Sequence, residues 1–381
     1  MGIIGTLASL VLIFLILLDG FETMISPRRV TRPYRFTRFF YRTSWSLWVA
    51  AARRFAPGKR RETFLSLFGP LSLLGLFTCW VAGLIIGFGL LHWSLGTALH
   101  TPDDTVDLPT YLYLSGVTFL TLGFGEVTPV TSLGRVLAVV EGGMGFGFIA
   151  VIIGYLPVLY QSFSRREVTI ALLDARAGSP PSAAQLLLRV AHARSKEAID
   201  PFLAEWERWA AELLESHLSF PVLSFYRSQH DNQSWLAALT TVLDTCTFMI
   251  AAVKDVCPYQ AQLTFAVARH AAVDLALVFR TSPRAPSVDR LSQEQLTRLR
   301  ADLREEGLML REGPAVEAKL TELRAMYEPF VNALSMRLMF ALPAIVPEKA
   351  VVDNWQTSAW TRRVAGFRRL PTLEASDQHF E

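Results

Sequence analysis

The stretch Thr121-Leu122-Gly123-Phe124-Gly125, preceded by the apolar segment 108–120, decides how this chain folds. Segment 108–120 predicts a short helix, because Asp107 can cap its N-terminus and Pro109 falls in its first turn, where a missing N–H costs nothing. We expect this helix to end near Leu120, so it is too short to span a membrane. Its carbonyl end would carry the negative pole of the helix dipole, which favours a cation.

The five residues after this helix have the composition of an ion filter. An ordinary strand points successive carbonyl groups in opposite directions, whereas a filter needs them all to face one axis. That geometry requires positive φ at some residues, which glycine supplies at little cost, and Gly123 and Gly125 stand at alternate positions. Rings of carbonyl oxygens offset the cost of stripping water from an ion. One chain supplies one wall, so four copies are needed around the axis.

Three apolar runs have the length of membrane helices: 2–18, 69–93 and 136–160. The first run is not followed by a small-residue cleavage site and lacks a basic start, which favours a membrane anchor over a signal peptide. The second and third runs flank the filter. The sequence therefore predicts three transmembrane helices with a re-entrant pore helix between the last two.

The basic residues predict the orientation of these helices. Between positions 27 and 61 there are 11 cations and no acid, which places this linker on the cytoplasmic side and the N-terminus outside. Its aromatic residues indicate an interfacial segment whose arginines meet anionic lipid headgroups, rather than a voltage sensor or a nucleic-acid site. The cations are Arg28, Arg29, Arg32, Arg35, Arg38, Arg42, Arg53, Arg54, Lys59, Arg60 and Arg61.

The pore segment resembles that of the potassium channel superfamily, whose signature is Thr-Val-Gly-Tyr-Gly-Asp. Three residues match it, and Leu122, Phe124 and Glu126 replace Val, Tyr and Asp. Leu114 stands where the family often has Trp, and Leu120 where it often has Thr. The resemblance covers residues 68–163. The loss of the Tyr hydroxyl leaves two interpretations open, a potassium-selective channel and a cation channel of weak selectivity.

The resemblance implies roles for particular residues. The filter residues would bind the permeating K⁺, and no other cofactor or metal is expected. Acidic residues at the outer mouth would concentrate cations, one glycine and one proline would form a gating hinge, and two further residues would support the filter. The filter residues are Thr121, Leu122, Gly123, Phe124 and Gly125, and the outer-mouth residues are Glu126, Asp103, Asp104 and Asp107. The hinge residues are Gly145 and Pro157, and the support residues are Glu141 and Thr118.

Residues 164–381 predict an α-helical cytoplasmic domain. Apolar stripes at helical spacing run through it, and the apolar segments 235–253 and 259–279 carry charged residues that favour buried helices of a soluble domain. The domain lacks a glycine-rich phosphate loop, and nothing in it suggests catalysis or nucleic-acid binding. We expect an unidentified cytoplasmic regulator to act on this domain.

The sequence thus predicts an all-α membrane protein in four parts: an anchor at 1–19, a basic linker at 20–66, a pore domain at 67–163 and a helical cytoplasmic domain at 164–381. We expect a homotetrameric channel of the cell inner (plasma) membrane, not an enzyme. A membrane-tethered interaction protein with a vestigial pore is the alternative of another class.

Overall fold

The computed structural model describes residues 2–26, 34–102, 105–192, 198–230, 233–254 and 256–347. The chain is an all-α membrane protein that divides into two compact units, Met1–Gln161 and Ser162–Glu381. Helix α6 (Ser132–Ala177) begins in the first unit and ends in the second.

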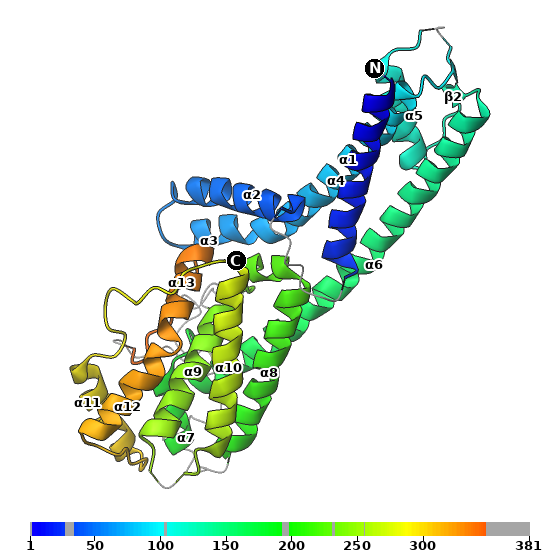
Figure 1. Ribbon diagram of the computed structural model, residues 1–381. Coiled ribbons are helices and arrows are strands. Elements are labelled where there is room, and N and C mark those ends of the chain that lie inside the picture. The colour runs from blue at the N-terminus through cyan, green and yellow to red at the C-terminus, as the bar shows by residue number, and fades with distance from the viewer. Residues whose placement is uncertain are drawn as a thin grey trace, which may run out of the picture. The chain divides into compact units, whose positions relative to one another are not determined.

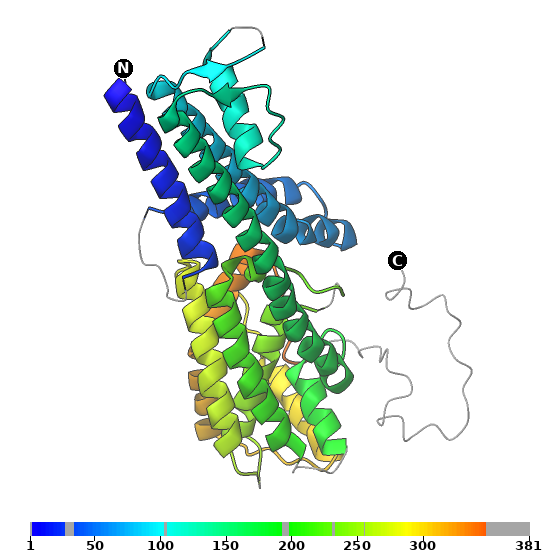
Figure 2. The ribbon, with the colours of Figure 1, turned by 90° about the vertical axis from the view of Figure 1, so that its right-hand side faces the viewer.

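Three long helices form the frame of the first unit: α1 (Gly2–Met24), α4 (Phe68–Ser94) and the first part of α6. Helices α1 and α4 lie side by side (Figures 1 and 2). They run antiparallel, because Thr6 near the start of α1 contacts Ser94 at the end of α4, with 3.0 Å between the hydroxyl oxygens. A Cβ at Gly87 would lie 2.7 Å from Ile13 Cγ1, so glycine lets these helices approach closely.

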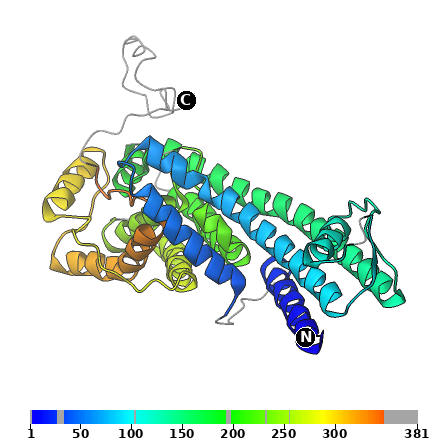
Figure 3. The ribbon, with the colours of Figure 1, turned by 90° about the horizontal axis from the view of Figure 1, so that it is seen from above.

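The basic linker is largely helical. It forms α2 (Phe36–Ala52) and α3 (Lys59–Ser66), and α2 lies along α3 and the start of α4 (Figure 3). The Trp48 ring stacks on Phe64 at 4.5 Å, and its indole N–H donates to the Phe64 carbonyl oxygen at 3.1 Å. Aromatic packing thus closes the α2–α3 hairpin.

One buried carboxylate ties three helices of this unit together. Asp19 of α1 accepts hydrogen bonds from the Trp80 indole of α4 and from the Thr37 backbone N–H in the first turn of α2, both at 3.0 Å. It therefore caps α2 from another helix. The predicted anchor ends at residue 19, but α1 continues five residues further to Met24, because Asp19 has these partners inside the protein.

The pore segment lies between α4 and α6. It contains the short helix α5 (Leu108–Phe119), which Figure 2 shows in cyan beside the ends of the longer helices. Two short strands, β1 (Leu99–His100) and β2 (Thr128–Pro129), pair antiparallel. The pairing joins the chain before α5 to the chain after the filter.

The second unit is a helical bundle, as the sequence predicts. Helices α8, α9 and α10 pack together in it, and α9 is buried along nearly its whole length (Figure 1). By length and composition α10 could cross a membrane, as could α1, the α3–α4 segment and α6. After the end of α6 the elements are α7 (Ala183–His192), α8 (Ile199–Ser219), the 3₁₀ helix η2 (Pro221–Phe225), α9 (Trp235–Ala251), α10 (Tyr259–Val278), α11 (Gln293–Glu305), α12 (Pro314–Ala325) and α13 (Glu328–Leu338).

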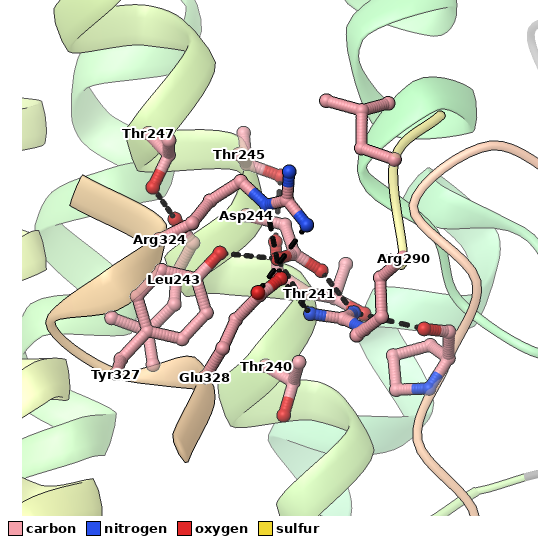
Figure 4. Close-up of polar contacts among 12 residues, drawn as sticks. Thr240, Thr241, Leu243, Asp244, Thr245, Thr247, Arg290, Arg324, Tyr327 and Glu328 are labelled. Atoms are coloured by element: carbon pink, nitrogen blue, oxygen red, sulfur yellow. Dashed lines mark hydrogen bonds and ion pairs between the residues drawn. The ribbon is translucent and has the colours of Figure 1, made fainter. Parts of the chain in front are cut away.

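A polar network is buried in this bundle around Asp244 of α9 (Figure 4). Both carboxylate oxygens accept from Arg290, at 3.1 and 2.7 Å, and one also accepts from the Tyr327 hydroxyl at 2.5 Å. Arg290 also contacts Glu328 at 3.2 Å. Burial opposes the charge of Arg290, but Asp244 raises the pKa of its guanidinium above the ordinary value. Asp244 and Arg290 thus form a buried ion pair in which both carboxylate oxygens are hydrogen-bonded.

Arg166 fixes the end of α6 within the second unit. Its guanidinium is buried and donates to the carbonyl oxygens of Leu223 and Tyr226, both at 2.9 Å. Its Nη1 also lies 3.3 Å from His217 Nε2. Because His217 Nδ1 faces the Leu213 carbonyl oxygen at 2.8 Å, Nδ1 carries the proton and Nε2 accepts. Burial and the Arg166 charge hold the pKa of His217 well below its usual range.

Candidate ion-conducting site

The pore helix has the boundaries that the sequence predicts. Asp107 accepts from the Thr110 backbone N–H at 3.1 Å and from its hydroxyl at 2.6 Å, and Pro109 occupies the first turn. The helix closes at Leu120, whose N–H bonds to the Gly116 carbonyl oxygen at 3.0 Å. A local capping signal at one end and the onset of the filter at the other therefore set the length of this helix.

The backbone of the predicted filter, residues 121–125, alternates between positive and negative φ. Thr121, Gly123 and Gly125 have φ of 58°, 59° and 86°, while Leu122 and Phe124 between them keep negative φ. Alternation of this kind turns successive carbonyl groups towards one side of the chain, unlike the opposed carbonyls of a strand. The two glycines adopt the conformation that the sequence analysis requires of them.

Thr121 is the third left-handed residue, and the sequence analysis did not predict it. Left-handed backbone at a β-branched residue costs about 1–3 kcal/mol and persists only where its surroundings impose it. The surroundings here are the end of the pore helix, where the Val117 carbonyl oxygen accepts from Leu122 N at 2.8 Å and from Gly123 N at 3.2 Å. The helix thus forces the first turn of the filter.

Of the two predicted support residues, Thr118 contacts the first residue of the predicted filter and Glu141 contacts the pore helix. The Thr118 carbonyl oxygen accepts from Thr121 N at 3.0 Å. Glu141 of α6 is buried and accepts from the Ser115 hydroxyl of α5, further back along the pore helix. Its other oxygen lies 3.6 Å from Nε2 of His92, a fully buried residue that the sequence analysis missed.

The structure gives Gly145 a packing role. A Cβ at this position would collide with the Phe119 carbonyl oxygen, at the end of the pore helix. The absence of a side chain therefore lets α6 contact the carbonyl end of α5. Pro157 lies inside α6, which is assigned as one helix from Ser132 to Ala177. Hinge motion at these two residues stays a prediction.

The outer-mouth residues fall in different places. Glu126 follows the filter and accepts a hydrogen bond from the Tyr113 hydroxyl of the pore helix. Asp107 is at the start of α5, where its side-chain and backbone hydrogen bonds from Thr110 lower the pKa of its carboxyl group. It therefore stays ionised at neutral pH. Asp103 and Asp104 lie outside the described residues.

The sequence around this site matches a known protein family. Residues 76–161 match the family described as Ion channel, a stretch that contains most of α4, the whole of α5 and the filter, and the first part of α6. Within the first unit, these are the elements that position the filter. The chain belongs to this ion channel family.

Sequence relatives of this ion channel protein support the assignment. It is 34% identical over 93 residues to Protein LctB of Bacillus caldotenax, a match that covers 22% of this chain and 69% of the relative. Protein LctB of Geobacillus stearothermophilus is 33% identical over 93 residues, with the same coverage. Uncharacterized membrane protein YdjJ of Bacillus subtilis (strain 168) is 24% identical over 208 residues, 53% of this chain and 59% of the relative. No solved structure matches the chain.

Proposed function

We propose that this protein is the subunit of a homotetrameric potassium channel that conducts K⁺ passively across the membrane. The observation that carries the proposal is the left-handed backbone at Thr121, Gly123 and Gly125, directly after a capped pore helix. Four such walls around one axis would surround a dehydrated ion with carbonyl oxygens of Thr121 to Phe124. The Thr121 hydroxyl would complete the innermost site.

The chain's own charges would assist entry and stabilise the ion within the pore. Asp107 and Glu126 would raise the concentration of cations at the outer mouth. The carbonyl end of α5 adjoins the filter, so four pore helices would direct their negative poles towards the ion. K⁺ is the transported ion in this proposal, and the channel needs no resident cofactor.

We propose that the protein lies in the plasma membrane with the N-terminus outside and residues 164–381 in the cytoplasm, as the basic linker predicts. Antiparallel α1 and α4 place the start of α1 beside the end of α4, which leads to the pore segment. At the other end of α4, the α2–α3 hairpin exposes cations together with Phe39, Leu47 and Phe55. We expect this surface to lie on anionic lipid headgroups. The exposed cations are Arg42, Arg53, Arg54, Lys59 and Arg60.

Flux from liposomes tests conduction. Gly123→Ala places a side chain at φ 59°, so flux should be abolished while assembly, measured by native mass spectrometry, stays tetrameric. The matched control is Gly116→Ala in the pore helix, where a Cβ meets only Ile85 Cγ2 at 3.9 Å and flux should be retained. A wild-type protein that passes no ions and captures a partner through residues 164–381 would support the interaction-protein alternative instead.

Phe124 favours a second candidate, a cation channel of weak selectivity. Its ring is 64% exposed in one chain, and among the described residues no ring contact involves it. Tyr113, an aromatic residue of the pore helix, bonds to Glu126 instead. A filter that lacks a tyrosine hydroxyl at this position would discriminate less well between K⁺ and Na⁺. Reversal potentials in a bilayer distinguish the potassium-selective channel from the weakly selective one. Equal permeability to both ions would contradict the potassium-selective proposal.

A further inference from the structure

Two polar atoms face each other inside the first unit without a hydrogen bond. His92 Nε2 and Glu141 Oε2 are 3.6 Å apart, and neither has a hydrogen-bond partner. Both side chains are 0% exposed. Buried polar atoms are rarely left in this condition, and exceptions tend to mark a role in function. A single proton between the two atoms would satisfy both.

The pair is linked to the pore helix on both sides. His92 Nδ1 lies 3.2 Å from the Thr97 hydroxyl, and the Thr97 carbonyl oxygen accepts from the Tyr111 hydroxyl of α5 at 2.9 Å. Glu141 accepts from Ser115, one turn further along α5. The chain of contacts thus connects α4, α5 and α6.

The hydroxyl of Ser115 links the charge of Glu141 to the pore helix. Its hydroxyl has one proton and two possible acceptors, the Ile85 carbonyl oxygen of α4 at 2.8 Å and the Glu141 carboxyl group of α6. A charged carboxylate accepts more strongly than a neutral carbonyl group. The protonation of Glu141 therefore decides whether the hydroxyl of Ser115 bonds to α4 or to α6.

We propose that His92 and Glu141 hold one proton between them and act as positioning residues for the pore helix, so that ion flux depends on the protonation of the pair. With one proton the pair has no net charge, which suits a site that water does not reach. Loss of this proton leaves a neutral imidazole beside a carboxylate and buries a net negative charge, and gain of a second proton buries a net positive charge. Either change alters the charge of the pair beside Ser115 and shifts the bond of its hydroxyl.

Among the described residues, several titratable groups on the helices around the pair have other partners. On α5, Tyr111 donates to Thr97 and Tyr113 to Glu126. On α6, Arg135 donates to the Pro129 carbonyl oxygen at 3.3 Å. On α1, Asp19 and Glu22 lie at the other end of the helix, beside Trp80 and Arg35.

The inference rests on the proposed conduction, and flux against pH is its first test. Wild-type flux should change several-fold along a pH series from acid to alkaline, wherever the pair gains or loses its proton. Glu141→Gln keeps an acceptor for Ser115 but cannot lose a proton, and His92→Gln removes the ring. Each variant should conduct, and its flux should depend less on pH than the wild-type flux. The double variant should depend on pH no less than either single variant.

The matched control is His100→Gln, which changes the other histidine of the first unit, an exposed residue on β1, and should keep the wild-type profile. A wild-type profile in either single variant of the pair, or independent effects in the double variant, would overturn the inference. If neither single variant assembles, Ser115→Ala must shift the profile, and an unchanged profile would overturn it equally.

A readout without flux separates this inference from the proposed function. Infrared difference spectra between acid and neutral pH, with isotope-labelled glutamate, report carboxylic acid groups. Glu141→Gln identifies the band of Glu141, and His92→Gln should shift it. An unshifted band would contradict the proton shared by His92 and Glu141, even if the channel conducts. A shifted band in a protein that passes no ions supports the pair and contradicts conduction.

Discussion

Glu141 in the first unit and Asp244 in the second are both buried carboxyl groups on helices, with side chains 0% and 1% exposed. Their partners differ. Asp244 has a guanidinium on both oxygens and a phenol hydroxyl on one, whereas Glu141 has one serine hydroxyl and an imidazole at 3.6 Å. Burial alone therefore does not define the role of a carboxyl group.

The difference lies in how completely the charge is compensated. A buried carboxylate that is hydrogen-bonded at both oxygens by a guanidinium holds one arrangement, since removal of either partner leaves a bare charge. A buried carboxyl group without such a counter-charge can exist with or without its proton. We therefore assign the first arrangement to stability and the second to the position of the pore helix. The same carboxyl-to-amide change at both sites tests this assignment.

Asp244→Asn should have the largest effect. The amide keeps an acceptor for Tyr327 but leaves Arg290 without its full counter-charge, which should cost about 3–5 kcal/mol of unfolding free energy. Denaturant unfolding of the full chain in detergent measures it. Asp302→Asn is the matched control, because its pair with Arg298 is exposed and 3.9 Å apart, and it should cost about 0.5 kcal/mol or less. Equal losses would remove the distinction between the two classes of carboxylate.

His217→Gln should have an intermediate effect that depends on pH. The histidine of the unfolded chain gains a proton below about pH 6.5 and that of the folded chain does not, so the unfolded state binds more protons there. This residue should then lower the unfolding free energy of the wild type by up to about 1.4 kcal/mol for each unit by which the pH is lowered below about 6.5. The variant should show a shallower acid slope in unfolding experiments.

The control for this slope is His270→Gln, which changes an exposed residue 3.9 Å from Asp274. It should leave the slope unchanged. A wild-type slope in His217→Gln would mean that His217 is not held neutral beside Arg166.

Glu141→Gln should have the smallest effect on stability. The amide still accepts from Ser115 and brings no charge into the interior, so the change should stay within about 1 kcal/mol. Thermal unfolding of the assembled protein measures it. A loss as large as that of Asp244→Asn would show that Glu141 and His92 form a structural ion pair, which would place the two sites in one class.

Local signals made the pore helix predictable. The cap at Asp107, the proline after it and the alternate glycines act within a few residues of each other. The left-handed Thr121 was not predictable, because its residue type opposes that conformation and the end of the pore helix imposes it. Propensity arguments therefore found the glycines and missed the strained residue before them.

Partners distant in sequence were also beyond prediction. His92 is one polar residue in the last turn of an apolar run, and the carboxyl group that it faces lies on another helix. In the sequence, Asp244 indicates only that its segment is not a membrane helix. Its partners Arg290 and Tyr327 are 46 and 83 positions away, so the sequence does not show the pairing. Such pairs become visible only once the helices are packed.

The length of α6 has a mechanical consequence. Its 46 residues, at about 1.5 Å each, measure about 69 Å, while the hydrocarbon core of a bilayer is about 30 Å thick. More than half of the helix must therefore project beyond the lipid tails. The part of α6 that belongs to the second unit contains Arg166, which donates to the carbonyl oxygens of Leu223 and Tyr226.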